Sequence, residues 1–196
     1  MPIRLLTSGG GTTTIQPTTS ASSVTLTVPS VNANVVTTGD TASVTQAMLG
    51  TGLAGTGPAF SAYASVAQSI PNNTWTRLQM NTEEFDTASC YDNATNYRFT
   101  PNVAGYYHVT GKATIAVGGT FYCASRLYKN GSGYYGGTTG IATVANYPNS
   151  VLSCLIYLNG TTDYIDYYVL HNYGSAQNAH SSVDTMLFQA YLVRAA

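Results

Sequence analysis

The chain has 196 residues, of which 44% are apolar and only 8% are charged, and its net charge is -1. Phosphate binding needs clustered Lys and Arg, whereas the seven basic residues are scattered, so we expect no nucleic-acid partner. Apolar runs are a few residues long, well short of the roughly 20 that a bilayer span needs, so we expect no membrane insertion. The polar share is mostly Thr, Ser, Asn and Gly, with 16 Tyr, which is typical of strands and turns.

Residues 1–57 differ from the rest, because they contain no aromatic residue and only two charges, Arg4 and Asp40. Such a polar composition is also typical of disorder, but two short runs rich in Val and Thr predict strands. The apolar residues of these runs are Val24, Leu26, Val28, Val35 and Val36. One chain buries little with strands this short, whereas three chains winding together can share an apolar axis. We therefore predict an attachment or stalk segment over 1–57 and a head over 58–196.

The head has the pattern of an antiparallel β-structure. Strands are predicted over 58–63, 75–80, 97–100, 105–117, 121–129, 150–158, 163–171 and 186–194. Asn130-Gly131 predicts a hairpin turn because both residues tolerate a positive φ, and 159–162 is expected to form a second hairpin. Short strands with turns at this spacing indicate an all-β sandwich or jelly roll.

Alternation along three of these strands predicts which side chains face the core. The inward sets are Tyr107, Val109 and Gly111, then Leu152, Cys154, Ile156 and Leu158, and finally Ile165, Tyr167 and Val169. Tyr is in excess of what the core needs, so part of it is expected at the surface or in subunit contacts, where a ring with one polar tip is suited.

Five phrases of the head, in this order and spacing, resemble the C1q-like globular head, a trimeric jelly roll related to the tumour-necrosis-factor fold. They are Pro58–Tyr63, Phe99–Val109, Arg126–Ser132, Tyr157–Gly160 and Met186–Val193. The resemblance implies a homotrimer that binds a partner and performs no chemistry. The segment before the head is similar to the attachment and stalk regions of bacteriophage fibre and appendage proteins.

The three cysteines, Cys90, Cys123 and Cys154, cannot all pair within one chain, and their spacing is not a zinc pattern. Cys123 and Cys154 lie in predicted strands, where free thiols behave as small buried hydrophobes. A Cys123–Cys154 bridge is the alternative if the two strands are neighbours.

Catalytic and metal sites are not expected. Nucleophilic catalysis needs a base that a third group orients, and His108 lies in the middle of a predicted strand. A loop carrying Glu83, Glu84, Asp86 and Asp92 is expected to be a solvated turn rather than a pair of glycosidase carboxylates. Some C1q-like heads bind calcium, for which Asp163 and Asp166 are the available carboxylates, but they lack ligand spacing. No cofactor is expected.

Recognition is expected in two exposed loops that combine Tyr with small polar residues, a composition suited to adaptable binding. The first is 130–140 and the second follows His171. The candidate receptor-binding residues are Tyr134, Tyr135, His171, Asn172, Tyr173, Gln177, Asn178 and His180. A surface glycan is a plausible ligand because aromatic rings stack on sugar faces.

These features together favour a structural protein of a bacteriophage virion, made in the host cytoplasm. In this interpretation the protein is a trimeric fibre or tail appendage, held to other virion proteins by its N-terminal segment, whose head binds a host glycan or protein. The alternative is a capsid decoration or head-fibre protein with a purely structural role. A secreted C1q-like lectin is disfavoured by the start of the chain, which lacks the pattern of a secretory signal.

Overall fold

The computed structural model describes residues 57–137, 140–142 (backbone only) and 147–196. Within them every regular element is a strand, so the all-β prediction is confirmed for this part of the chain. No helix in the described part is long and apolar enough to span a membrane. The predicted attachment residues Val24, Leu26, Val28, Val35 and Val36 lie outside the described residues, and the boundary near 57 stays a prediction.

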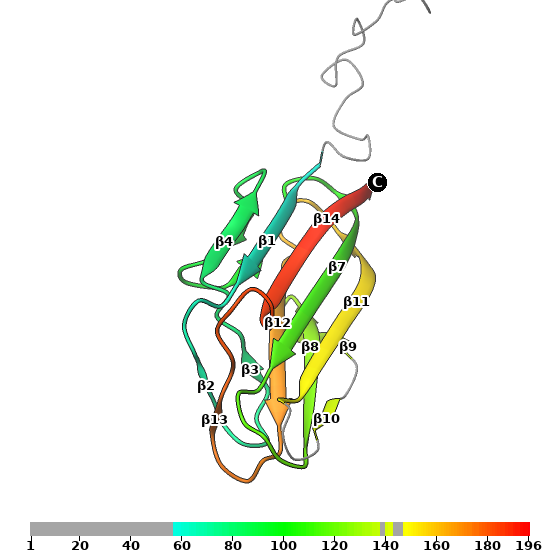
Figure 1. The fold of residues 1–196 in the computed structure, drawn as a ribbon. Coiled ribbons are helices and arrows are strands. Elements are labelled where there is room, and N and C mark those ends of the chain that lie inside the picture. Colours follow the sequence, from blue (N-terminus) through cyan, green and yellow to red (C-terminus); the bar gives the residue numbers. More distant parts are fainter. Residues whose placement is uncertain (1–56, 138–139, 143–146) are drawn as a thin grey trace, which may run out of the picture. The chain divides into compact units, whose positions relative to one another are not determined.

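Two antiparallel sheets lie face to face (Figure 1). The first has the order β11 (Asn149–Leu158), β7 (Gly105–Thr114), β14 (Leu187–Ala195), β1 (Ala59–Tyr63) and β4 (Thr82–Asp86). The second contains β10 (Gly140–Ala142), β8 (Phe121–Lys129), β12 (Ile165–His171), β6 (Arg98–Phe99) and β5 (Tyr91–Asp92), with β3 (Thr76–Arg77) beside β12 and β9 (Ser132–Gly136) beside β8. A small pair joins β13 (Gln177–Asn178) to β2 (Ser69–Ile70). Because sequence neighbours mostly pair with distant strands, this is a jelly roll and not a meander.

Aromatic rings from both sheets fill the space between them. Phe60 of β1 stacks on Phe99 of β6 with ring centroids 4.6 Å apart, and Phe188 of β14 stacks on Tyr167 of β12 at 5.5 Å. The alternation predicted for β7, β11 and β12 is confirmed, since their inward residues are buried, except that Cys154 is half-buried. Stacked and edge-on pairs of this kind add to the hydrophobic stabilisation of a core.

The turn at Asn130-Gly131 is confirmed as a hairpin. The φ values of Asn130 and Gly131 are 52° and 78°, as a two-residue turn matching the twist of its strands requires. The turn folds β9 back against β8, so Tyr134 and Tyr135 lie on a strand and not in a loop as predicted. Both side chains remain exposed.

The second predicted hairpin is wrong. β11 pairs with β7 in the five-stranded sheet, whereas β12 pairs with β8, β6 and β3 in the other sheet. Residues 159–162 therefore carry the chain from one sheet to the other. Gly160 has a φ of 72°, and a Cβ there would lie 2.3 Å from the backbone nitrogen of Ala104, so the crossing requires glycine.

Two further predictions near residue 80 need correction. The acidic segment is not a loop, because Thr82–Asp86 is β4 and pairs with β1 at the edge of the sheet. The strand predicted over 75–80 is reduced to Thr76–Arg77, although the Leu78 amide still donates to the Tyr167 carbonyl at 2.8 Å. In both cases the available neighbouring strand, and not local residue preference, determined the structure.

The three cysteines are free thiols, so the alternative Cys123–Cys154 bridge does not form. The two residues lie in different sheets, Cys123 on β8 and Cys154 on β11. Burial raises the pKa of Cys123 to about 12 and that of Cys154 to about 11, which keeps both thiols protonated and unreactive at neutral pH.

Candidate functional site

The outer face of the five-stranded sheet is apolar over three adjacent strands. Leu155 of β11 is 60% exposed, and Tyr106 of β7 and Tyr191 of β14 are also exposed. The exposed large apolar residues of these three strands are Tyr106, Val151, Leu155, Tyr157, Tyr191 and Val193, and we call them the subunit face. An apolar set of this kind on adjoining strands is the usual mark of a protein contact.

Rings and hydroxyls link the strands of the subunit face. The rings of Tyr106 and Tyr157 are 5.5 Å apart, and those of His108 and Tyr191 are 5.3 Å apart. His108 Nε2 lies 3.0 Å from Ser153 Oγ. A catalytic triad also contains a serine–histidine contact of this kind, but it needs a carboxylate that orients the histidine. In the described part of the chain no carboxylate orients this histidine, so the contact serves as a polar link within an apolar face.

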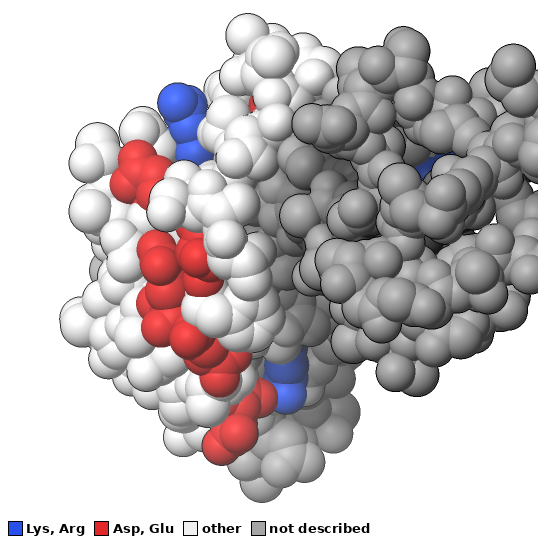
Figure 2. Space-filling view, turned by 90° about the horizontal axis from the view of Figure 1, so that it is seen from above, with Lys and Arg blue, Asp and Glu red and all other residues white. Residues whose placement is uncertain are grey.

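The acidic residues do not combine into a site. Glu83, Glu84 and Asp86 lie on β4 and Asp92 lies on β5, and Figure 2 shows acidic side chains in a row along this side of the described chain. Glu84 accepts a hydrogen bond from Ser61 Oγ at 2.6 Å, and Asp86 accepts one from the Tyr91 amide at 2.7 Å.

Asp92 is likewise engaged in its own turn. It accepts hydrogen bonds from the backbone amides of Ala94, Thr95 and Asn96, and these lower its pKa to about 2. Asp86 and Asp92 thus hold local backbone and Glu84 holds the Ser61 hydroxyl, which argues against a pair of carboxylates that faces a substrate.

The predicted recognition residues fall into two groups that lie at opposite sides of the view in Figure 1. Tyr134 and Tyr135 form one group on β9. The other is the segment around β13, where Asn172, Tyr173 and Asn178 are exposed while Gln177 and His180 are half-buried. Asn172 Oδ1 accepts a hydrogen bond from the Tyr122 amide at 2.7 Å, so that side chain holds the segment against β8.

His171 must be removed from the recognition residues. Its side chain is 0% exposed, and its Nε2 lies 2.9 Å from the Ile70 carbonyl oxygen. The alternation that directs Ile165, Tyr167 and Val169 inward continues to His171. Extending the predicted inward set from Val169 by two residues would therefore have placed the His171 side chain in the core.

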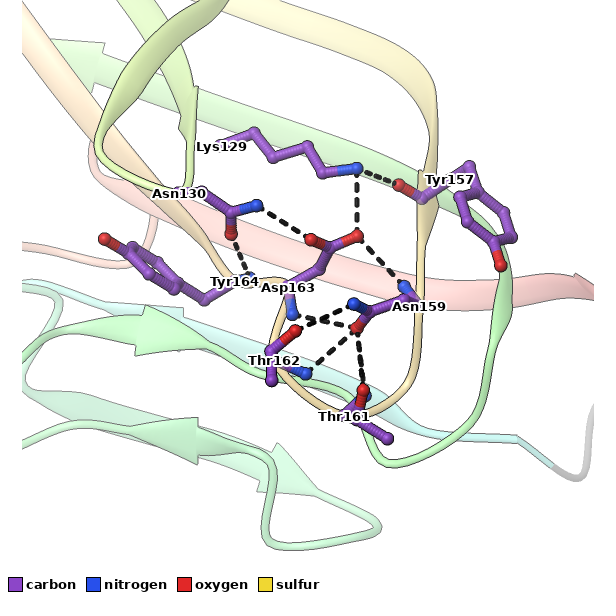
Figure 3. A network of polar contacts seen from close by, with 8 residues as sticks. All are labelled: Lys129, Asn130, Tyr157, Asn159, Thr161, Thr162, Asp163 and Tyr164. Carbon is purple, nitrogen blue, oxygen red and sulfur yellow. Dashed lines mark hydrogen bonds and ion pairs between the residues drawn. The ribbon is translucent and has the colours of Figure 1, made fainter.

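A network of polar contacts surrounds residues 159–162, where the chain crosses from one sheet to the other (Figure 3). Asp163 pairs with Lys129 Nζ at 3.0 Å and accepts hydrogen bonds from Asn130 Nδ2 at 2.7 Å and the Asn159 amide at 3.1 Å. These interactions lower the pKa of Asp163, with the Asn130 bond as the largest cause. The carboxylate considered for calcium therefore ties the β8–β9 turn to the crossing.

The other carboxylate considered for calcium is buried in the second sheet. Asp166 on β12 is 2% exposed, and its Oδ1 has no hydrogen-bond partner among the described residues. Burial raises its pKa from 3.8 to about 6, although the nearby Arg77 and Arg98 lower it in part. An ionised carboxylate here is costly because neither arginine forms an ion pair with it.

We expect Asp166→Asn to stabilise the protein at alkaline pH. With a folded pKa of about 6 against 3.8 in the unfolded chain, Asp166 contributes stability below pH 4 that is lost as the pH rises through 6. The loss amounts to about 3 kcal/mol at pH 8, so the uncharged variant should gain about 1–3 kcal/mol there and nothing at pH 4. Urea unfolding at both pH values measures this difference.

Asp163→Asn is the matched control, because the pKa of Asp163 is lowered and its contribution has the opposite sign. This variant should lose stability at pH 8 and approach the parent protein as the pH falls below 3. A loss of stability in Asp166→Asn at pH 8 would instead show that Arg77 and Arg98 favour the ionised carboxylate.

The same fold occurs in solved proteins of different kinds. The globular domain of zebrafish complement 1qA protein has a TM-score of 0.53 at 15% identity, over 71% of this chain and 99% of that chain. The Eiger TNF from S. frugiperda has a TM-score of 0.55 at 8% identity, over 71% and 95%. The PRD1 vertex protein P5 has a TM-score of 0.50 at 16% identity, over 70% and 97%.

No protein-family model and no curated protein matches the chain. At these identities the structural likeness establishes the fold, and the predicted C1q/TNF-like jelly roll is confirmed.

Proposed function

We propose that the chain is a homotrimeric structural protein of a bacteriophage virion, and that residues 58–196 form a head that binds the host cell surface. In this proposal residues 1–57 attach the trimer to other virion proteins. Three modest sites on one trimer, and several trimers on one particle, give strong adsorption through multivalency.

The observation that carries the proposal is the subunit face. Leu155 on β11 and Tyr191 on β14 expose large apolar side chains on one face of the five-stranded sheet, and the exposure of such side chains to water is unfavourable. A closed threefold arrangement covers the same face in every chain, as symmetric oligomers do. The likeness in fold to C1q and TNF domains supports a trimer as the form of this assembly.

The likeness to the PRD1 vertex protein P5 supports a place on a virion, and it also favours the second candidate function. In that alternative the protein is a capsid decoration or head fibre, and its head binds nothing. The two functions share the trimer and differ in whether the head is needed for adsorption.

Light scattering of the full-length chain tests the assembly. We expect a mass of three times the 20.6 kDa chain mass. A monomer would overturn the proposal.

Adsorption of particles that carry Tyr134→Ala with Tyr135→Ala then tests recognition. We expect weaker adsorption with an intact trimer, because both rings are exposed on β9. The control is Val66→Ala with Phe85→Ala, two exposed apolar positions that lie outside β9 and outside the candidate receptor-binding residues. Unchanged adsorption of the β9 variant would remove these tyrosines from the site.

A further inference from the structure

Three arginines and three tyrosines share the outer face of the second sheet. In β12, Asp166 and Tyr168 alternate with the buried Ile165 and Tyr167, so they point away from the core. Asp166 is directly opposite Arg98 of β6 and Tyr128 of β8. Residues directly opposite in an antiparallel pair place their side chains on the same face.

The next row repeats this arrangement. Tyr168 is directly opposite Arg77 of β3 on one side and Arg126 of β8 on the other. Tyr164, two residues before Asp166, lies beneath the guanidinium of Arg98. We call this set the Arg–Tyr face; its members are Arg77, Arg98, Arg126, Tyr128, Tyr164 and Tyr168.

Positive charge gathers on this face. Three of the seven basic residues of the protein meet around β12. Within the described residues, none of these three guanidinium groups forms an ion pair or a side-chain hydrogen bond. The ion pair of this part of the chain joins Lys129 to Asp163. Each guanidinium has five N–H donors in a planar fork, so many donors remain for a bound anion.

Stacking holds the arginines and tyrosines in place. The guanidinium of Arg126 lies 4.4 Å from the ring centre of Trp75, and that of Arg98 lies 4.4 Å from the ring centre of Tyr164. The rings of Tyr128 and Tyr168 stack on each other at 3.9 Å. A guanidinium stacked on a ring keeps its N–H edges free, so these contacts orient the donors without occupying them.

A second observation indicates that this cationic face is built rather than incidental. Asp166 is buried at its centre with an unpartnered Oδ1, although Arg98 is directly opposite and Arg77 is near enough to act on its charge. Neither Arg77 nor Arg98 forms an ion pair with Asp166, so both guanidinium groups keep donors for a ligand. Asp92 of β5 is also directly opposite Arg98, so two carboxyl groups face three guanidinium groups, which leaves an excess of positive charge in a protein of net charge -1.

We propose that the Arg–Tyr face binds an acidic sugar of a surface polysaccharide, with guanidinium groups on the sugar carboxylate and tyrosine hydroxyls on its hydroxyl groups. This inference rests on the proposed host-binding role and names the chemical class of its ligand. Forked guanidinium–carboxylate pairs supply orientation as well as affinity.

The ring contacts distinguish this ligand from nucleic acid. Single-stranded nucleic acids bind where ring faces are free to stack on bases. Here Tyr128 and Tyr168 each cover one face of the other ring, and an arginine covers one face of Trp75 and of Tyr164, so fewer ring faces are free for bases. The remaining donors and acceptors lie at ring edges, which suits a ligand rich in hydroxyl groups.

The test uses the full-length protein and oligosaccharides in matched pairs, each pair a uronic-acid oligomer and its carboxyl-reduced neutral form. We expect the acidic member of at least one pair to bind tenfold or more tightly than the neutral member. Arg126→Gln should weaken acidic binding at least tenfold without changing neutral binding, and Arg126→Lys should fall between, because it keeps the charge and loses the fork.

Two further variants complete the test. Arg77→Gln leaves the Arg126–Trp75 stack in place and should weaken acidic binding in the same direction, so a folding defect of one variant is not decisive. Arg194→Gln removes one exposed positive charge from β14 in the other sheet and should leave binding unchanged. Equal losses in Arg194→Gln and Arg126→Gln would overturn the site, because net charge alone would then explain them.

Three other results would overturn the inference. The first is equal binding of the acidic and the neutral oligosaccharide in every pair. The second is binding of the acidic oligosaccharide that neither Arg77→Gln nor Arg126→Gln weakens. The third is binding of single-stranded DNA or polyglutamate by a protein that binds no uronic-acid oligomer. A trimer that adsorbs to host cells but does not bind acidic sugars would overturn this inference and leave the proposed function in place. A monomer that binds uronic-acid oligomers would overturn the proposed function and leave this site in place.

Discussion

Leu155→Arg is expected to convert the proposed trimer into folded monomers. Leu155 is 60% exposed on β11, the edge strand of the sheet, where it lies opposite His108 of β7 within the subunit face. In a covered interface the new charge would be buried without a partner three times per trimer, at a cost of about 3–5 kcal/mol for each chain. Light scattering should show one chain mass where the parent protein shows three, with an unchanged β-sheet signal in circular dichroism.

Val66→Arg is the matched control for this prediction. Val66 is as exposed as Leu155 but lies between β1 and β2, away from the subunit face. It should leave the trimer intact. A trimer that survives Leu155→Arg would show that this sheet face is not the contact between chains, and the proposed assembly would then lose its main support.

Phe188→Ala is expected to have the largest effect on folding stability. Phe188 is 0% exposed and its ring contacts those of Phe60, Tyr91 and Tyr167, which belong to both sheets. Truncating a buried phenylalanine removes its transfer free energy and leaves a cavity, and the loss is about 3–5 kcal/mol. Urea unfolding measures this loss, with the parent protein and the variant compared at the same chain concentration.

Phe85→Ala makes the same chemical change on the edge strand β4, where the ring is 50% exposed. It should cost less than about 1 kcal/mol, since surface substitutions away from packed features have small effects. Similar losses in both variants would show that the aromatic contacts between the sheets do not dominate the stability of the head.

Much of the head follows from local sequence patterns. Alternation along β12 placed Ile165, Tyr167 and Val169 in the core, and the pair Asn130-Gly131 placed a hairpin, because both signals depend on residues that are close in the chain. The resemblance to C1q-like heads gave the correct fold although no sequence relative supports it.

The errors occurred where partners are distant in the chain. Residues 159–162 have the composition of a hairpin turn, yet the strands on either side pair in different sheets. The segment over 82–86 has the charge of a solvated loop, yet β1 offers it an edge to pair with. Turn chemistry and charge describe what a segment tolerates, whereas pairing depends on which strand lies beside it.

The Arg–Tyr face shows the same limit for function. Arg77, Arg98 and Arg126 are separated by more than twenty residues from one another, and scattered basic residues indicate no site in a sequence. They meet because β3, β6 and β8 all pair with β12, a register that only the folded sheet defines.

The sequence by itself determined that the described head is all-β, which residues of its main strands face the core, and where its tight turn lies, because these depend on period-two alternation and on backbone freedom at Asn130 and Gly131. The tertiary structure alone decided which strands are neighbours. That choice buried His171 and Asp166, left Leu155 and Tyr191 on an open apolar face, and gathered three arginines around one strand. Contacts between distant segments depend on packing two whole sheets against each other, and no local pattern encodes them.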